Sequence, residues 1–175
     1  MIYLGLDASD NFRFLGIVIG ESSELEFLYN YLLRSVREPR IHVSKFKRDK
    51  KSILIKSFYR VVNECSSLRF YSIDTDLLRE ARKLSRTKRI PKVKAAGIIL
   101  VKILKKILSS VPMYVGAIDL DKEFVPFEPQ IRKYFSTLTY NGIYSQLADL
   151  IAYMNFKRIA KEPIRTLNWS NLFLS

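Results

Sequence analysis

Apolar positions along the chain follow two different spacings, and each change of spacing marks a new element. Residues 2–9 and 12–20 are runs of aliphatic, β-branched and aromatic side chains, with the polar pair Asp10-Asn11 between them. Runs of this composition predict β-strands, and two of them around a short polar turn predict an antiparallel hairpin. The chain is therefore expected to open with two paired strands.

Three later runs of the same kind predict further strands, at residues 68–74, 113–119 and 136–140. The first two of these runs end on an aspartate, Asp74 and Asp119.

Apolar residues at helical spacing fill the segments between the strands. Residues 22–36 carry Ser23 and Glu26 in capping-box spacing and predict the first helix. A second helix is expected at about residues 48–64, after a short extended segment at residues 40–44.

Two basic helices are expected next. Pro91 suits the first turn of the second of them, because its missing N–H costs nothing there, and an apolar stripe then runs from Val93 to Ile107. Asn141-Gly142 turns the chain into a last helix.

The order of these elements predicts an α/β fold: an antiparallel N-terminal meander, then parallel strands, in one mixed sheet flanked by helices. This order resembles that of an RNase H-like domain. A Rossmann-type nucleotide-binding fold would need a glycine-rich turn after the first strand, and the six glycines form neither that motif nor a P-loop. With 175 residues, 48% of them hydrophobic, residues 1–175 are expected to form a single domain. The C-terminal tail from about residue 162 is expected to pack back on it.

Charge narrows the class of partner. Thirty Lys and Arg stand against 17 Asp and Glu, a formal net charge of +13, which favours a polyanion such as DNA or RNA over a membrane surface. Lysines interrupt the longest apolar run, and the N-terminus has no signal-peptide pattern. Because Cys65 is the single cysteine, no internal disulfide can form. These features predict a cytoplasmic protein with no membrane segment, and leave the oligomeric state open.

The positive charge is concentrated in two clusters, within about residues 37–60 and 79–94, that contain only three acids. Such clusters suit contacts to phosphates, which give affinity with little sequence preference. The residues expected to bind nucleic acid are Lys45, Lys47, Arg48, Lys50 and Lys51 in the first cluster, and Arg86, Lys88, Arg89 and Lys92 in the second.

Four aspartates occupy positions where a charge is costly. Asp7, Asp74 and Asp119 lie at the ends of apolar strand runs, and Asp149 is the only charged residue between Lys133 and Lys157. Each of them either pairs with a Lys or Arg, or shares a divalent cation with the others. Carboxylate oxygens from separate elements are the ligands that Mg²⁺ or Mn²⁺ requires, and two such ions can cleave a phosphodiester. The four aspartates are therefore candidate metal ligands and catalytic residues.

Several short motifs carry a resemblance to a known family. They are Asp7 in "DAS", "RIHVSKF" at 40–46, "GAIDLD" at 116–121 and "QLADL" at 146–150. Together they resemble the domain-of-unknown-function 3800 family of the RNase H-like superfamily, over the stretch from Ile2 to about Tyr153. Two positions depart from the family pattern: Ala8 stands where the first motif has Glu, and the Ser-Lys that commonly precedes the final helix is missing.

The resemblance implies that Asp7 and Asp149 are metal ligands. It leaves the next ligand open between Asp74, if that residue ends the fourth strand of an RNase H topology, and Asp119, which the family motif favours. Lesser candidates are Asp121 and Glu64.

The function implied is a divalent-metal-dependent nuclease that hydrolyses phosphodiesters, or performs related phosphoryl transfer, on DNA or RNA with Mg²⁺ or Mn²⁺. Because of the two departures, the alternative is a non-catalytic nucleic-acid-binding protein on the same fold with a decayed metal site. A small-molecule phosphohydrolase is disfavoured, since it would not need so wide a basic surface.

Two further residues are possible accessories to the site. His42, the only histidine, is either a proton shuttle or phosphate contact, or simply a surface histidine. Gln146 lies one turn before Asp149 on the last helix, within reach of that carboxylate or of a substrate.

Overall fold

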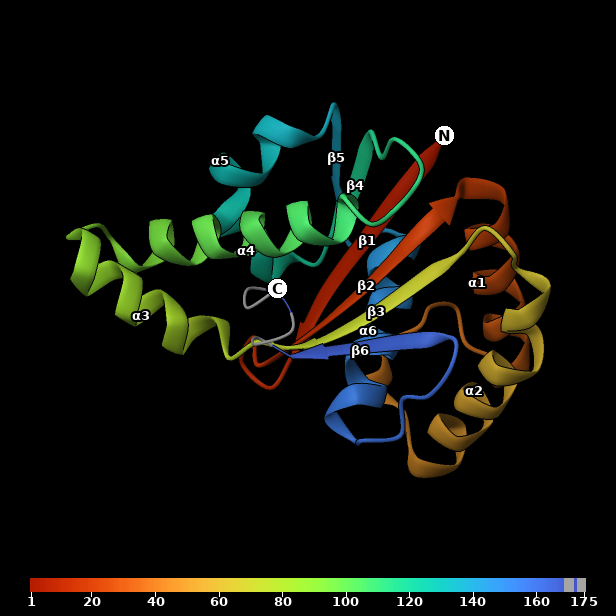
Figure 1. The fold of residues 1–175 in the computed structure, drawn as a ribbon. Coiled ribbons are helices and arrows are strands. Elements are labelled where there is room, and N and C mark those ends of the chain that lie inside the picture. Colours follow the sequence, from red (N-terminus) through yellow and green to blue (C-terminus); the bar gives the residue numbers. More distant parts are fainter. Residues whose placement is uncertain (169–171, 173–175) are drawn as a thin grey trace.

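The apolar runs form a mixed six-stranded sheet in the computed structural model, which describes residues 1–168 and residue 172 (Figure 1). The strands are β1 (Ile2–Ser9), β2 (Phe14–Glu21), β3 (Arg69–Asp74), β4 (Ala117–Leu120), β5 (Thr137–Tyr140) and β6 (Ile164–Asn168). Their order across the sheet is β5-β4-β1-β2-β3-β6. The pairs β1–β2 and β2–β3 are antiparallel, whereas β4, β5 and β6 run parallel to the strands they join. The expected α/β class with a mixed sheet is confirmed.

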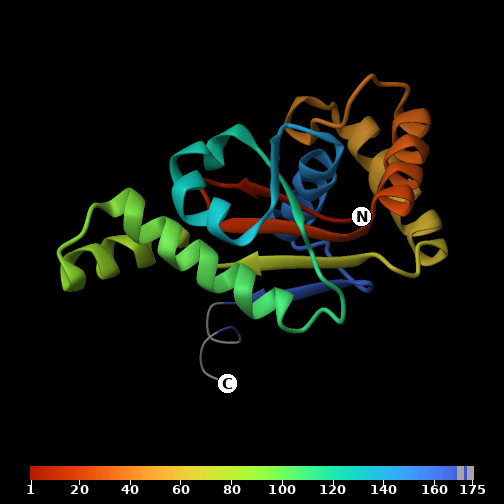
Figure 2. The ribbon, with the colours of Figure 1, turned by 90° about the horizontal axis from the view of Figure 1, so that it is seen from above.

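Helices cover both faces of the sheet (Figures 1 and 2). One layer contains α1 (Ser22–Val36), α2 (Arg48–Val61) and α6 (Ile143–Phe156), whose apolar side chains share one core with the sheet. The opposite layer contains α3 (Leu77–Lys88), α4 (Lys92–Leu108) and the short α5 (Glu128–Ile131), which share the other. None of the helices in the described part of the chain is long and apolar enough to cross a membrane.

The helix that carries Asp149 lies directly against the first two strands. A Cβ on Gly5 of β1 would stand 2.1 Å from the carbonyl oxygen of Tyr144, and a Cβ on Gly16 of β2 would stand 2.1 Å from that of Ala148. Only glycine lets the backbones of strand and helix approach so closely. These two glycines therefore bring α6 onto the sheet next to Asp7.

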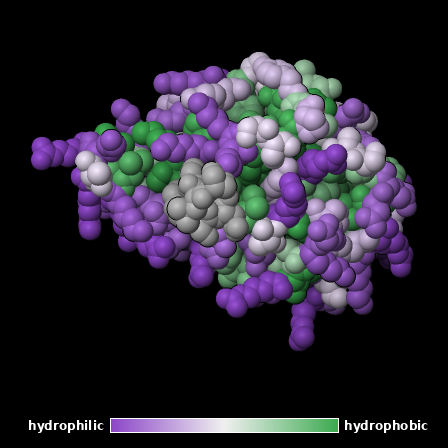
Figure 3. Space-filling view, in the orientation of Figure 1, coloured by the Kyte–Doolittle hydropathy of each residue, from purple (hydrophilic) through white to green (hydrophobic). Residues whose placement is uncertain are grey.

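The two basic helices α3 and α4 form a hairpin, and its tip projects beyond the sheet in both views (Figures 1 and 2). Only Leu77 and Ala81 of α3 are buried, whereas most of α4 packs on the sheet. Hydrophilic side chains gather over the projecting part (Figure 3). Arg86, Lys88 and Arg89 are exposed at its tip.

Several expected boundaries differ in the structure. The run expected to end at Asp119 forms β4, which continues to Leu120. Residues 40–44 form no strand: the chain bends there and enters the 3-10 turn Val43–Lys45. Because 40–44 is not a strand, the third strand of the sheet is the run ending at Asp74, and the fourth is β4.

Three smaller expectations were also wrong. No side chain caps α1, and Ser22, rather than Ser23, donates a hydrogen bond to Glu26. Val93 is half-exposed instead of buried, and the buried residues of α4 begin at Ala95. The tail contains a strand that was not expected, β6, parallel to β3. Beyond it Leu172 is buried, while residues 169–171 and 173–175 lie outside the described part of the chain.

Candidate functional site

Three aspartates from distant parts of the sequence line one cavity of about 250 Å³. Asp7 lies near the end of β1 and Asp121 directly after β4, the parallel neighbour of β1. The N–H of Asp121 donates to the carbonyl of Leu6, the residue before Asp7. Asp7 and Asp121 therefore lie side by side on neighbouring chain segments. Asp149 faces them from α6. An adjoining hollow of about 460 Å³ is lined by the same three residues and by Glu123. We call this group of four residues the acidic pocket.

In each of the three aspartates, one carboxylate oxygen accepts a hydrogen bond from a backbone N–H. Asp7 Oδ1 accepts from the N–H of Ala8 at 2.6 Å, and Asp121 Oδ1 from the N–H of Glu123 at 2.8 Å. Asp149 Oδ2 accepts from the N–H of Val43 at 2.9 Å. No hydrogen bond from a described residue reaches the second oxygen of any of the three. These second oxygens are therefore open to a cation.

The pocket is electrostatically unbalanced around Asp7. Burial raises the pKa of Asp7 from 3.8 to about 9, and the charges of Asp149 and Asp121 add to this rise, while the N–H of Ala8 lowers it. Among the described residues, no ion pair is formed by Asp7 or Asp121. Burial and the neighbouring acids therefore favour the protonated form of the Asp7 carboxyl group, and a bound cation would favour its charged form.

The pKa values of Asp149 and Glu123 are shifted in the same direction. Burial raises the pKa of Asp149, although the Val43 N–H and His42 lower it, and Asp121 raises it further. Burial also raises the pKa of Glu123, with added repulsion from Asp121 and Asp149. A shared cation would relieve all of these repulsions at once.

The segment before α2 is fastened to α6 by two side chains. Gln146 Oε1 accepts from the N–H of Ile41 at 3.1 Å and from the hydroxyl of Tyr29 at 2.6 Å. Asp149 accepts from Val43, as described above. Gln146 therefore positions this segment, and among its hydrogen bonds to described residues none reaches the Asp149 carboxylate. Its side chain also lines the cavity.

His42 stands on this segment at the edge of the acidic pocket. Its Nδ1 lies 3.8 Å from Asp149 Oδ2, too far for a good hydrogen bond, and its side chain is 44% exposed. It lines both hollows. The ring is therefore accessible to solvent and to a substrate.

Asp119 has a different structural task. It is fully buried, and its carboxylate accepts from the N–H groups of Gly142, Tyr144 and Ser145 and from the hydroxyl of Thr139. The three N–H donors lie at the N-terminus of α6, where a carboxylate satisfies orphan N–H groups and complements the helix dipole, whereas Thr139 belongs to β5. Asp119 does not line the acidic pocket.

Asp74 is also outside the pocket. Its carboxylate lies 3.9 Å from Nε of Arg13, and its side chain is 45% exposed. It ends β3, two strands from β1, so it is not beside Asp7 as the expected fourth-strand position required. Glu64 lies at the far end of α2, exposed and outside both hollows.

Asp121, a lesser candidate from the sequence, and Glu123, which sequence reasoning missed, therefore take the places expected for Asp74 and Asp119. The signal was present in "DLDKE" at 119–123, where three acids alternate at the end of an apolar strand. The sequence favours Asp119 over Asp121 as a ligand because the apolar run that predicts the strand ends at Asp119.

Cations surround the acidic pocket without neutralising it. Arg40, Lys45 and Lys122 line the cavity, and Lys51 and Lys157 line the adjoining hollow. Of the other residues expected to bind nucleic acid, Lys50 forms an ion pair with Glu38, while Arg86, Lys88, Arg89 and Lys92 belong to the α3–α4 hairpin. Lys47 is the residue before α2 and is exposed.

The donor set suits a hard divalent cation, but its members are not gathered into a ready ligand shell. Carboxylate oxygens are the ligands that Mg²⁺ and Mn²⁺ prefer. Within the described residues, however, no three His, Cys, Asp or Glu side chains stand close enough together to hold a metal as they are placed. Ion binding would need the carboxylate oxygens to move toward one another.

No protein-family model matches the chain, and no curated protein is significantly similar to it.

Proposed function

We propose that the chain is a divalent-metal-dependent nuclease of the RNase H-like type, acting on DNA or RNA, in which Asp7, Asp121 and Asp149 hold Mg²⁺ or Mn²⁺. One observation carries the proposal. Three aspartates from the first strand, the end of the fourth strand and the last helix line a single cavity, and each keeps one carboxylate oxygen free. Structural aspartates are normally paired with cations or fully hydrogen-bonded, as Asp74 and Asp119 are here.

The topology supports the same interpretation. The order β3-β2-β1-β4-β5, with three antiparallel strands followed by two parallel ones, is what the RNase H-like resemblance implies, and β6 is an addition at the β3 edge. In that arrangement the acid after the strand beside β1 is a ligand, and in this chain that position is Asp121.

The chemistry follows from the residues around the cavity. Bound Mg²⁺ or Mn²⁺ would activate water and stabilise the leaving oxygen of a phosphodiester. The backbone N–H groups of Ala8, Val43 and Glu123 fix the orientation of the three aspartates. Arg40 and Lys45 stand where they can hold the substrate phosphates. His42, accessible at the edge, can exchange a proton with the reacting oxygens.

A second candidate function is a nucleic-acid-binding protein with a decayed site. It is favoured by the ungathered ligands and by Ala8 in place of the family's Glu. It predicts binding without cleavage.

A cleavage assay separates the two functions. Labelled single-stranded and duplex DNA and RNA are incubated with the parent protein in Mn²⁺, in Mg²⁺ and in EDTA. The nuclease proposal predicts metal-dependent cleavage that Asp7→Asn and Asp121→Asn each abolish, because each removes a charged ligand.

The matched control is Asp74→Asn, which removes an aspartate at the same edge of the sheet that does not line the cavity. It should retain the parent's activity. Absence of cleavage with every substrate, or an Asp121→Asn protein as active as the parent, contradicts the proposal.

A further inference from the structure

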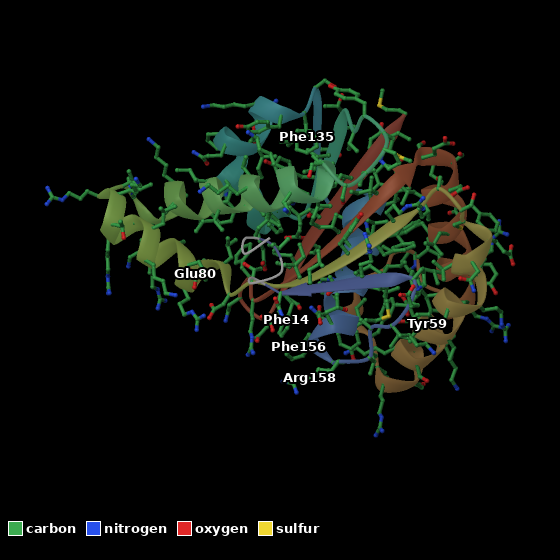
Figure 4. The ribbon with its side chains drawn as sticks, viewed as in Figure 1. Phe14, Tyr59, Glu80, Phe135, Phe156 and Arg158 are labelled. Carbon is green, nitrogen blue, oxygen red and sulfur yellow. The ribbon has the colours of Figure 1, made fainter. Side chains whose placement is uncertain are left out.

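A second groove lies next to the acidic pocket, between α2 and the carboxyl end of α6. Its volume is about 990 Å³. The α2 side is formed by residues three or four positions apart on one helix face, and the other side by the last turn of α6 and the chain that follows it. Figure 4 shows Tyr59 on the α2 side, and Phe156 and Arg158 at the end of α6. We call this feature the basic groove.

Among the described residues, the basic groove is lined by cations and by no acid. The cations are Arg48, Lys51, Lys56, Arg60, Lys157 and Lys161. None of the six forms an ion pair with a described residue. So many unpaired cations around one groove repel each other, and a bound polyanion would neutralise them.

Two tyrosine rings also line the groove. Tyr59 and Tyr153 are half-buried, and lysine ammonium groups lie over them: Lys161 at 4.8 Å from the Tyr59 centroid and Lys51 at 5.2 Å from the Tyr153 centroid. The Tyr59 hydroxyl is fixed by the N–H of Lys161. Aromatic rings among cations are the arrangement on which unpaired bases stack while their phosphates are held.

The basic groove continues into the acidic pocket. Lys51, Tyr153 and Lys157 line both the groove and the hollow that contains Asp7 and Asp149. A nucleic-acid strand whose phosphates lie along the basic groove would therefore reach the candidate metal ligands Asp7 and Asp149.

We propose that the basic groove binds a single-stranded segment of nucleic acid and delivers it to the acidic pocket. The bases of a duplex are paired and stacked on each other, so only an unpaired strand can use the tyrosine rings as well as the cations. The proposal deepens the proposed function by naming its substrate and rests on it for the delivery step. Binding itself is independent of metal and can be tested alone.

The first experiment removes charge from the groove at residues that do not line the acidic pocket. The triple variant Lys56→Ala, Arg60→Ala, Lys161→Ala is compared with the parent in EDTA, by fluorescence anisotropy of a labelled oligothymidine of about 15 nucleotides. Three lost phosphate contacts should lower the slope of log affinity against log salt by about 2, since each contributes about 0.7 for single strands.

The matched control removes three exposed lysines from the opposite helical layer, outside both basic clusters: Lys102→Ala, Lys105→Ala, Lys133→Ala. Because the net charge is the same in both triple variants, the control separates a local contact from a general charge effect. It should keep most of the parent's slope. If the slope falls equally in the two triple variants, or does not fall in the groove variant, the proposal is overturned.

The second experiment tests the stacking. Tyr153→Phe keeps the ring, and Tyr153→Leu removes it. Only the leucine variant should bind the single strand more weakly, by about tenfold, while duplex affinity stays unchanged. If both variants bind like the parent, or the parent prefers a duplex of the same sequence, single-strand recognition is refuted. Competition by polyglutamate as strong as that by the oligonucleotide would point to an acidic protein and overturn it as well.

These outcomes are distinct from failure of the proposed function. A parent that cleaves with Mn²⁺, but whose groove variant binds normally, overturns only the groove. A parent that binds through the groove and never cleaves overturns only the nuclease.

Discussion

Replacing Asp7 with asparagine probes whether the acidic pocket is built for a cation. Burial, with the neighbouring charges of Asp149 and Asp121, raises the pKa of Asp7 from 3.8 to about 9. Between these values the folded, metal-free protein keeps a proton that the unfolded chain has lost. Stability therefore falls as the pH rises from about 4 to about 9, because the native state binds more protons than the unfolded one.

The magnitude follows from the size of this shift. At about 1.4 kcal/mol per pH unit, a carboxyl group with pKa values of 3.8 unfolded and about 9 folded costs roughly 4 kcal/mol at neutral pH. That figure is an upper bound, because water entering the cavity lowers the cost. An expected range is about 1 to 4 kcal/mol. The amide side chain of the Asp7→Asn variant would keep an acceptor oxygen for the Ala8 N–H and carry no charge.

Metal-free Asp7→Asn should thus be more stable than the parent at neutral pH, and the difference should grow with pH and vanish near pH 4. Thermal melting in EDTA across this range measures it, at roughly 2 to 4 °C per kcal/mol for a chain of this size. Asp74→Asn, an exposed carboxylate paired with Arg13, is the control and should change little. An Asp7→Asn protein whose loss of stability relative to the parent grows as the pH rises would refute the reasoning, since it would mean that the Asp7 carboxylate is charged and satisfied in the fold.

Three other predictions concern the same architecture. Mn²⁺ at about a hundredfold excess over its Kd should stabilise the parent by about 2.7 kcal/mol in thermal melts, and Asp149→Asn should lose most of that response; a parent indifferent to Mn²⁺ and Mg²⁺ contradicts the metal proposal. Asp119→Ala should destabilise the protein by several kcal/mol, on the order of 3, in urea titrations, because buried N–H groups at the start of α6 lose their acceptor; a neutral effect would show that the cap is dispensable. Gly16→Ala should lower the free energy of unfolding by about 2 kcal/mol or more, because the added Cβ would stand 2.1 Å from the Ala148 carbonyl oxygen. It should also weaken the stabilisation by Mn²⁺, because it displaces α6. An unchanged melting temperature both with and without Mn²⁺ would argue against the close approach.

The order of the elements from β1 to α6, apart from the segment 40–44, and two residues of the acidic pocket could be predicted from the sequence because they depend on local pattern. The spacing of the apolar residues distinguishes the strands from the helices. Asp7 and Asp149 stand out as single charges in apolar elements. The close approach of α6 was not predicted, although Gly5 and Gly16 are visible in the sequence. Their meaning depends on which helix lies over them.

The choice between Asp119 and Asp121 needed the tertiary structure. The two residues are only two positions apart, Asp119 in β4 and Asp121 directly after it. What separates them is the start of α6, whose N–H groups meet Asp119 and leave Asp121 to the cavity. No property of the segment 116–121 alone says where a helix that begins at Ile143 will lie.

The basic groove was only half visible in the sequence. The run of cations near residues 45–60 predicts a phosphate-binding surface, but it does not show that Lys50 is taken by Glu38 while Lys51 faces the groove. The other wall comes from Tyr153 and the residues after α6, which join α2 only in the folded chain.

The most direct test of the central claim is the position of bound Mn²⁺ in crystals of the protein, located by its anomalous scattering. The proposal predicts a peak among the carboxylates of Asp7, Asp121 and Asp149, with oxygen ligands at roughly 2 Å. No peak in the acidic pocket at saturating Mn²⁺, or a peak at Asp74 or Asp119 instead, would contradict it.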